Sequence, residues 1–172
     1  ATIGELEDKD AIQETIGGGH IAFKTRKLNI GITGVHTIYG GNIERNLQPY
    51  SQFQFNSNTS TLLGIDYNWV FKNFNFFGEA ARSQNGGLGV LAGTMASLSP
   101  NFTFSAIYRN YSKDFQNLKT TAFAESSLAT NESGLFLGID GKINKNWTLS
   151  AYMDKFKYPW LKYQIDSPNS SG

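Results

Sequence analysis

The sequence predicts an all-β fold, namely an antiparallel up-and-down transmembrane β-barrel of which eight strands are visible. Large apolar residues alternate with small polar ones, most clearly in residues 146–153, and strict alternation places the two kinds on opposite faces of a strand. Such stretches recur along the chain and follow very short polar turns, as hairpin strands do. The composition agrees, because 18 glycines, 14% aromatic residues and only 17% charged residues favour strands and tight turns over helices.

The alternating stretches define eight expected strands of about ten residues each, the usual length of a barrel strand. They occupy residues 20–26, 28–39, 61–71, 74–81, 88–98, 102–111, 135–143 and 147–158. Pro159 ends the last strand because proline cannot donate a hydrogen bond to a ladder.

Three regions follow from this assignment. We expect residues 1–19 to be a polar N-terminal loop segment, residues 20–161 to hold the β-barrel strands, and residues 162–172 to be a C-terminal loop tail. Outer-membrane barrels commonly end on an aromatic strand, whereas this chain ends on a polar tail. The eight strands therefore either close a small barrel or, if the chain is a fragment, form part of a larger one.

The connections between the strands alternate in length. Minimal turns are expected at Lys27, Lys72, Pro100 and Lys145. Long polar connections are expected at residues 40–60 and 112–133, and Gln84–Gly87 is a strong hairpin signal between them. In an up-and-down meander this order places every minimal turn at one end of the sheet and both long loops at the other, as in outer-membrane barrels.

The polar face of the strands carries the candidate lumen-facing side chains. These are Asp66, Glu79, Arg109, Asp140 and Asp154. In a membrane barrel the apolar face meets lipid and such groups fill the interior, where they pair with opposite charges; in a soluble barrel or sandwich the apolar face points inward. Alternation alone does not decide between these two arrangements.

Aromatic residues gather near the strand ends. We expect Phe74, Phe102 and Trp147 at the short-turn end, and Tyr108 and Trp160 at the other end, to be interfacial aromatics. Girdles of this kind mark the two boundaries between membrane and water. Together with the loop asymmetry, they favour the transmembrane barrel over the soluble alternative.

The chain also resembles the barrel portion of a family of Gram-negative outer-membrane proteins described as helix-hairpin-helix domain-containing. The passages that carry the resemblance are IGITGVHT (30–37), NFFGE (75–79), NGG (85–87), YRNY (108–111), AFAES (122–126) and FKYPWLKY (156–163). The resemblance extends over essentially the whole chain and implies a location in the cell outer membrane. Family members carry a small module before the barrel that is similar to the DNA-binding modules of competence proteins. That module has no counterpart in these residues, so a nucleic-acid partner follows only from family analogy.

No catalytic, metal or cofactor site is expected. The chain has no cysteine, and His20 and His36 lie far apart in the sequence, so we interpret them as isolated strand histidines. Ser126 stands beside Glu125 in a long connection that contains no histidine to act as a base. The net charge of +1 is far below that of a typical nucleic-acid-binding domain.

The sequence therefore predicts a non-enzymatic integral outer-membrane barrel that acts as a scaffold, a pore or a subunit of an envelope complex. Its partners would be the lipid bilayer and proteins that contact the loops at 40–60 and 112–133, because loops on a rigid scaffold carry recognition. Two alternatives remain, namely a transport or DNA-uptake barrel linked to a periplasmic DNA-binding module, and a soluble β-sandwich binding module.

Overall fold

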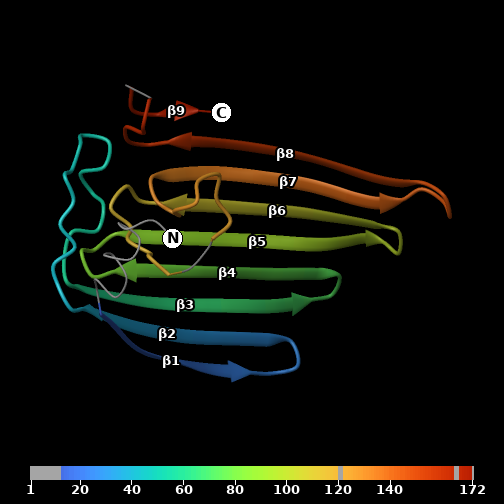
Figure 1. The fold of residues 1–172 in the computed structure, drawn as a ribbon. Helices are drawn as coiled ribbons and strands as arrows, with labels where there is room; N and C mark the ends of the chain where they lie inside the picture. The colour runs from blue at the N-terminus through green and yellow to red at the C-terminus, as the bar shows by residue number, and fades with distance from the viewer. Residues whose placement is uncertain (1–12, 120–121, 165–166, 172) are drawn as a thin grey trace, which may run out of the picture.

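The described part of the chain forms a single antiparallel sheet whose nine strands follow one another in sequence order (Figure 1). The computed structural model describes residues 13–119, 122–164 and 167–171. The strands are β1 (Glu14–Lys24), β2 (Leu28–Tyr39), β3 (Thr59–Phe71), β4 (Phe74–Ser83), β5 (Leu88–Ser99), β6 (Phe102–Tyr111), β7 (Glu132–Lys142), β8 (Thr148–Tyr158) and β9 (Ser170–Ser171). The predicted all-β, up-and-down arrangement is confirmed.

The described residues contain no helix that is long and apolar enough to cross a membrane.

The edges of the sheet differ from the sequence prediction. β1 begins at Glu14 rather than His20, because residues 17–19 continue the ladder with β2, with Gly18 opposite Val35. A ladder needs only backbone groups, so three glycines weaken a strand without ending it. At the other edge, two residues of the predicted tail form β9, which pairs with Lys157 and Tyr158. Residues 1–12 of the predicted N-terminal loop lie outside the described residues.

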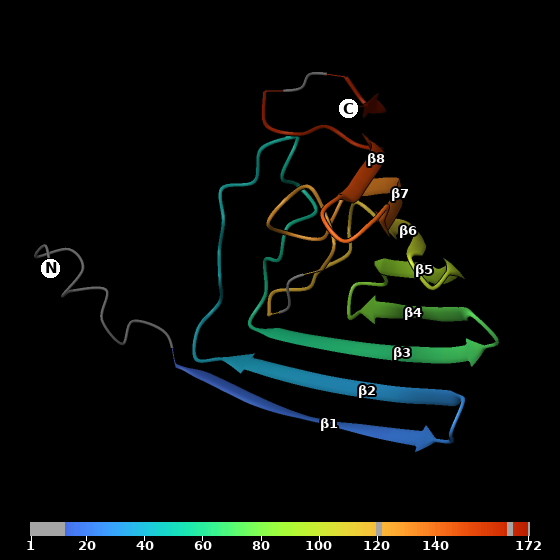
Figure 2. The same ribbon diagram turned by 90° about the vertical axis from the view of Figure 1, so that its right-hand side faces the viewer.

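The sheet curves without closing into a barrel. In the described residues β1 pairs only with β2, and β9 pairs only with β8. Figure 2 shows the sheet bending from β1 to β8, with the long loops on its concave side. The prediction of a barrel closed by these eight strands is therefore wrong for this structure, and the remaining possibility from the sequence is that the sheet is one part of a larger barrel.

Short turns and long loops lie at opposite ends of the sheet, as the sequence predicts. The connections β1–β2, β3–β4, β5–β6 and β7–β8 lie at one end of the sheet, and both long loops lie at the other (Figure 1). Lys72 adopts φ 55° in the two-residue β3–β4 turn, and Gly86 adopts φ 95° in the β4–β5 turn. The β7–β8 connection, residues 143–147, is longer than the minimal turn predicted at Lys145, and the Asn144 side chain accepts hydrogen bonds from the amides of Asn146 and Trp147 within it.

The register of the ladders defines two chemically different faces. Residues directly opposite each other in a ladder share a face. Asp66 is opposite Glu79, Glu79 is opposite Leu91, and Leu91 is opposite Arg109. This is the concave face, because the buried cluster that the loops build against it includes Ala81 of β4 together with Tyr111 of β6.

The convex face carries large apolar side chains that nothing in the described residues covers. Exposed side chains on it include Ile21, Phe23, Ile32, Leu63, Ile65, Trp69, Leu135, Leu149 and Met153. Among the described strand residues, the lysines and arginines that the register places on this face are Arg82, Lys155 and Lys157. All three lie in the half of the sheet nearer the long loops, so the centre of the convex face is uncharged.

Candidate functional site

The β6–β7 loop (112–131) fills the hollow of the sheet at its loop end. Phe115 and Ala129 of this loop are buried against Tyr111 of β6 and Ala81 of β4. On the far side of the hollow, the ammonium of Lys119 contacts the Glu14 carboxylate of β1 at 2.5 Å. This contact raises the pKa of Lys119, because the carboxylate stabilises the charged ammonium. The loop thus connects strands that are distant in the sheet.

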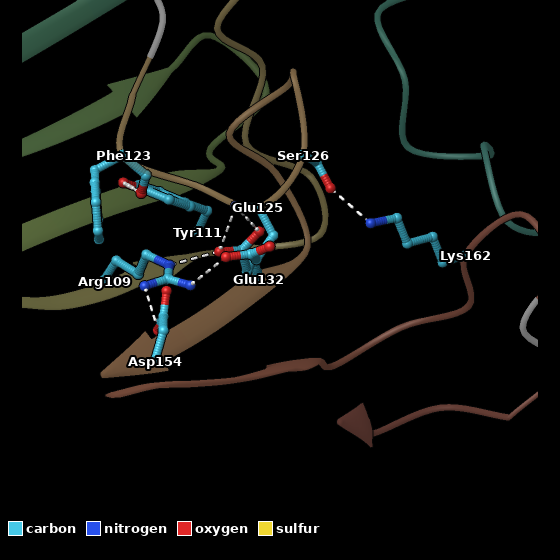
Figure 3. Close-up of polar contacts among 8 residues, drawn as sticks. All are labelled: Arg109, Tyr111, Phe123, Glu125, Ser126, Glu132, Asp154 and Lys162. Atoms are coloured by element: carbon cyan, nitrogen blue, oxygen red, sulfur yellow. Dashed lines mark hydrogen bonds and ion pairs between the residues drawn. The ribbon is translucent and has the colours of Figure 1, made fainter. Parts of the chain in front are cut away.

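A buried arginine forms the centre of the contact between the loop and the sheet (Figure 3). Nε of Arg109 donates to Oε1 of Glu132 at 2.5 Å, and Nη1 donates to Oδ1 of Asp154 at 2.9 Å. The side chains of Arg109 and Glu132 are fully buried. The cluster joins β6, β7 and β8, and its opposite charges compensate the cost of burying each one.

The same cluster holds the loop in place. Both carboxylate oxygens of Glu132 accept the backbone N–H of Glu125, at 3.1 and 3.2 Å. The hydroxyl of Tyr111 donates to the carbonyl oxygen of Phe123 at 3.0 Å. Loop residues 123–125 are therefore fixed to the sheet by charge-assisted and neutral hydrogen bonds together, as Figure 3 shows.

The surroundings of Arg109 are shaped to accept a flat guanidinium. Its Cζ lies 5.1 Å from the centre of the Phe123 ring and 6.0 Å from that of Phe156, which are cation–π distances. Opposite Arg109 in the ladder is Gly134, and a Cβ there would lie 2.7 Å from the guanidinium carbon. Any larger residue at Gly134 would displace the arginine.

The cluster around Arg109 is better suited to holding the β6–β7 loop against the sheet than to catalysing a reaction. Arginine stays protonated in proteins, so Arg109 cannot serve as a base. Its Nη2 is buried without a hydrogen-bond partner, and the nearest acid oxygen in an ion pair with it is Oε1 of Glu125 at 3.9 Å. Ser126, next to Glu125 in the loop, does not join the cluster, because its hydroxyl accepts a hydrogen bond from Lys162.

The five polar residues predicted to share a face all lie on the concave face, but they do not form one cluster. Arg109 and Asp154 contact each other. Asp66 lies 3.3 Å from Nε2 of His20, and Asp140 accepts a hydrogen bond from Ser150 at 2.6 Å. Glu79 lines a cavity of about 270 Å³ between the sheet and the β6–β7 loop.

The predicted interfacial aromatics fall into two groups. Phe74 and Phe102 lie on the convex face at the short-turn end, Tyr108 lies on that face at 45% exposure, and Trp147 at the β7–β8 connection is 67% exposed. Trp160 lies elsewhere. Its Nε1 donates to the carbonyl oxygen of Pro49, so it belongs to the loop layer. Alternation no longer applies to it, because the strand has ended at Tyr158.

The histidines do not come together. His20 points to the concave face beside Asp66, whereas His36 is on the convex face, where its Nδ1 lies 2.9 Å from the Thr61 hydroxyl. Within the described residues, no group of three or more histidines and acids is placed to hold a metal ion.

Sequence analysis missed Glu132, although it is the most buried acid of the cluster. It lies inside the long connection predicted at residues 112–133, three positions before the predicted strand start at Leu135. Extending the alternation backwards from Leu135 places Ser133 on the convex face and Glu132 on the concave face. That signal was available, but nothing local identified Arg109 as the partner.

A second cavity, of about 400 Å³, lies at the loop end. It is bounded by the β2–β3 loop (40–58), the β6–β7 loop and residues 158–163. Its charged lining residues are Arg45, Lys113 and Lys162, and aromatic rings supply much of the remaining wall.

No protein-family model matches the chain, and no curated protein shows significant similarity to it. The family resemblance therefore stays a prediction.

Proposed function

We propose that this chain contributes a transmembrane sheet to an outer-membrane β-barrel and acts there as a non-enzymatic scaffold or subunit of an envelope complex. The observation that carries the proposal is the polarity of the curved sheet. Its convex face is apolar and uncharged at the centre, whereas its concave face carries most of the charged strand residues, including every acidic one described. In a soluble curved sheet the apolar side chains would line the concave side and form the core.

Exposed apolar area on this scale supports a lipid-facing surface. The apolar residues of the convex face run across eight neighbouring strands, from Ile21 on β1 to Met153 on β8. Soluble proteins rarely leave contiguous apolar patches larger than a few hundred Å² exposed. Apolar side chains that face lipid avoid the unfavourable free energy of exposure to water. The charged Arg82, Lys155 and Lys157 lie nearer the loop end of the sheet, where polar headgroups would surround them.

The free edges of the sheet favour a larger assembly. In lipid, every backbone N–H and C=O needs a partner, so a membrane sheet has to close on itself. In the described residues one edge of β1 is unpaired, and at the other side of the sheet β9 covers only Lys157 and Tyr158 of β8. Further strands, or a second copy of the chain, would have to pair with these edges.

The loop contacts favour a filled interior over an open pore. Arg109, Glu132 and Asp154 fix the β6–β7 loop inside the hollow, and Lys119 reaches Glu14 on the other side. Passage of DNA is disfavoured further, because carboxylates outnumber lysines and arginines on the concave face of the strands. The carboxylates are Glu14, Asp66, Glu79, Glu132, Asp140 and Asp154, against Lys24, Arg109 and Lys142.

Membrane fractionation followed by electrophoresis tests the proposal. We expect the protein in its native cell to leave the membrane only with detergent, and to migrate differently before and after boiling, because a closed strand ladder resists unfolding in mild detergent. Release into the aqueous fraction without detergent would contradict the proposal. It would favour a soluble binding module in which a second sheet covers the convex face.

A further inference from the structure

The cavity at the loop end has the size of a small-molecule site. Its volume of about 400 Å³ falls in the usual range for ligand pockets. It is lined by the β2–β3 loop, the β6–β7 loop and the segment that follows β8. Figure 2 shows the two long loops on the concave side of the sheet. A ligand would therefore reach it from the solvent at the loop end and not through the convex face.

The charge of this cavity has one sign. Among the residues that the structure describes, its lining includes Arg45, Lys113 and Lys162 and no aspartate or glutamate. None of the ion pairs found among the described residues involves any of these three cations. A concave site lined by cations of this kind concentrates anions, because its walls exclude water and focus the field.

Lys113 and Lys162 contact uncharged groups, which do not neutralise their positive charge. The Lys113 ammonium lies 4.5 Å from the centre of the Phe53 ring and 4.3 Å from that of Trp160. Lys162 donates to the Ser126 hydroxyl at 2.6 Å, and its ammonium lies 3.6 Å from the centre of the Tyr158 ring. Rings and a hydroxyl orient an ammonium without neutralising it. A lysine also has three donors, so N–H groups remain for a ligand.

The remaining wall offers apolar and aromatic surface. Phe53 meets Trp160 edge to face at a centroid distance of 5.8 Å, and Tyr50 meets Tyr163 in the same manner at 5.7 Å. Both pairs line the cavity. Apolar walls with a few convergent polar groups are the common composition of ligand sites.

We propose that this cavity binds a small amphipathic anion. A carboxylate or phosphate group of the ligand contacts Lys113 and Lys162, and its ring or apolar body packs against Phe53, Trp160 and Tyr163. The site is independent of the proposed membrane role, because its lining residues other than Tyr158, the last residue of β8, lie outside strands β1 to β8. Failure of one proposal therefore leaves the other standing.

Trp160 provides a local reporter for the test. The chain has three tryptophans, and Trp69 and Trp147 lie outside the cavity lining. In the W69F/W147F background, Trp160 fluorescence is followed while the full chain is titrated with phenyl phosphate, and separately with benzyl alcohol as an uncharged comparator. We expect saturable binding of phenyl phosphate at least tenfold tighter than that of benzyl alcohol, weakening as salt is added.

Removing either lysine should weaken this binding. We expect Lys113→Gln and Lys162→Gln each to raise the Kd of phenyl phosphate about tenfold, which corresponds to about 1.4 kcal/mol. Lys145→Gln is the matched control and should leave the Kd unchanged, because Lys145 is in the β7–β8 connection, at the end of the sheet opposite the long loops (Figure 1). Absence of saturable binding, equal affinity for the two probes, or a Kd unchanged in both lysine variants would overturn the proposal. Two separate variants keep the test valid if one of them fails to fold.

Discussion

Replacing Arg109 by methionine is expected to lower the free energy of unfolding by about 3–5 kcal/mol, the usual result of removing one partner of a buried ion pair. The substitution leaves the Glu132 carboxylate fully buried and without its cation, and it also removes the donor to Asp154. Urea unfolding of the protein in lipid vesicles, followed by tryptophan fluorescence, measures the change. Loop residues 123–125 should become sensitive to protease, because the anchor of the Glu125 amide depends on Glu132.

Two further variants test whether the unpaired Glu132 charge causes the loss of stability in Arg109→Met. Adding Glu132→Gln to the Arg109→Met variant should recover part of the lost stability, since it removes the unpaired charge. Arg82→Met removes an exposed arginine and should change the free energy of unfolding by less than about 1 kcal/mol. If Arg109→Met were no more harmful than Arg82→Met, the buried cluster would not anchor the loop.

The second large effect is expected at the centre of the convex face. Ile65 lies midway along β3 and is 51% exposed, so Ile65→Arg places a charge where we propose the middle of the bilayer. Arginine on a lipid-facing strand costs about 2–4 kcal/mol at the midplane and about 0–1 kcal/mol near the interface. We expect Ile65→Arg to destabilise the protein in vesicles within the larger range.

Ile38→Arg is the matched control for this prediction. Ile38 is on the same face and is comparably exposed, but it lies at the loop end of β2. We expect it to cost no more than about 1 kcal/mol, because an interfacial arginine reaches the headgroups. In water, both substitutions would replace an exposed isoleucine and change stability by about 0.5 kcal/mol or less. Equal small effects at the two positions would therefore contradict a lipid-facing convex face.

Strand identity could be predicted well because its signal is local. In β3, Leu63, Ile65 and Trp69 alternate with smaller or polar residues, and the two-residue turn after Phe71 is recognisable by itself. The same local pattern placed Asp66, Glu79, Arg109, Asp140 and Asp154 on one face.

The contacts within the site could not be predicted because they join residues far apart in the chain. Arg109 meets Glu132 and Asp154, which are 23 and 45 positions away. Alternation shows which face a residue occupies, but not how far the sheet curves or where a loop folds. For the same reason, nothing in the sequence indicated that the β6–β7 loop reaches Glu14 through Lys119.

Ile65 and Asp66 are adjacent in β3 but lie on opposite faces of the sheet, so labels at these two positions test most directly which face meets lipid. The chain has no cysteine, so single cysteines at Ile65 and at Asp66 can each carry a fluorophore without any background labelling. Ile65 is on the convex face and Asp66 is on the concave face beside His20. In vesicles that contain brominated lipid, we expect strong quenching of the label at position 65 and little quenching at position 66. Quenching at neither position, or at position 66 alone, would contradict the central claim that the convex face meets lipid.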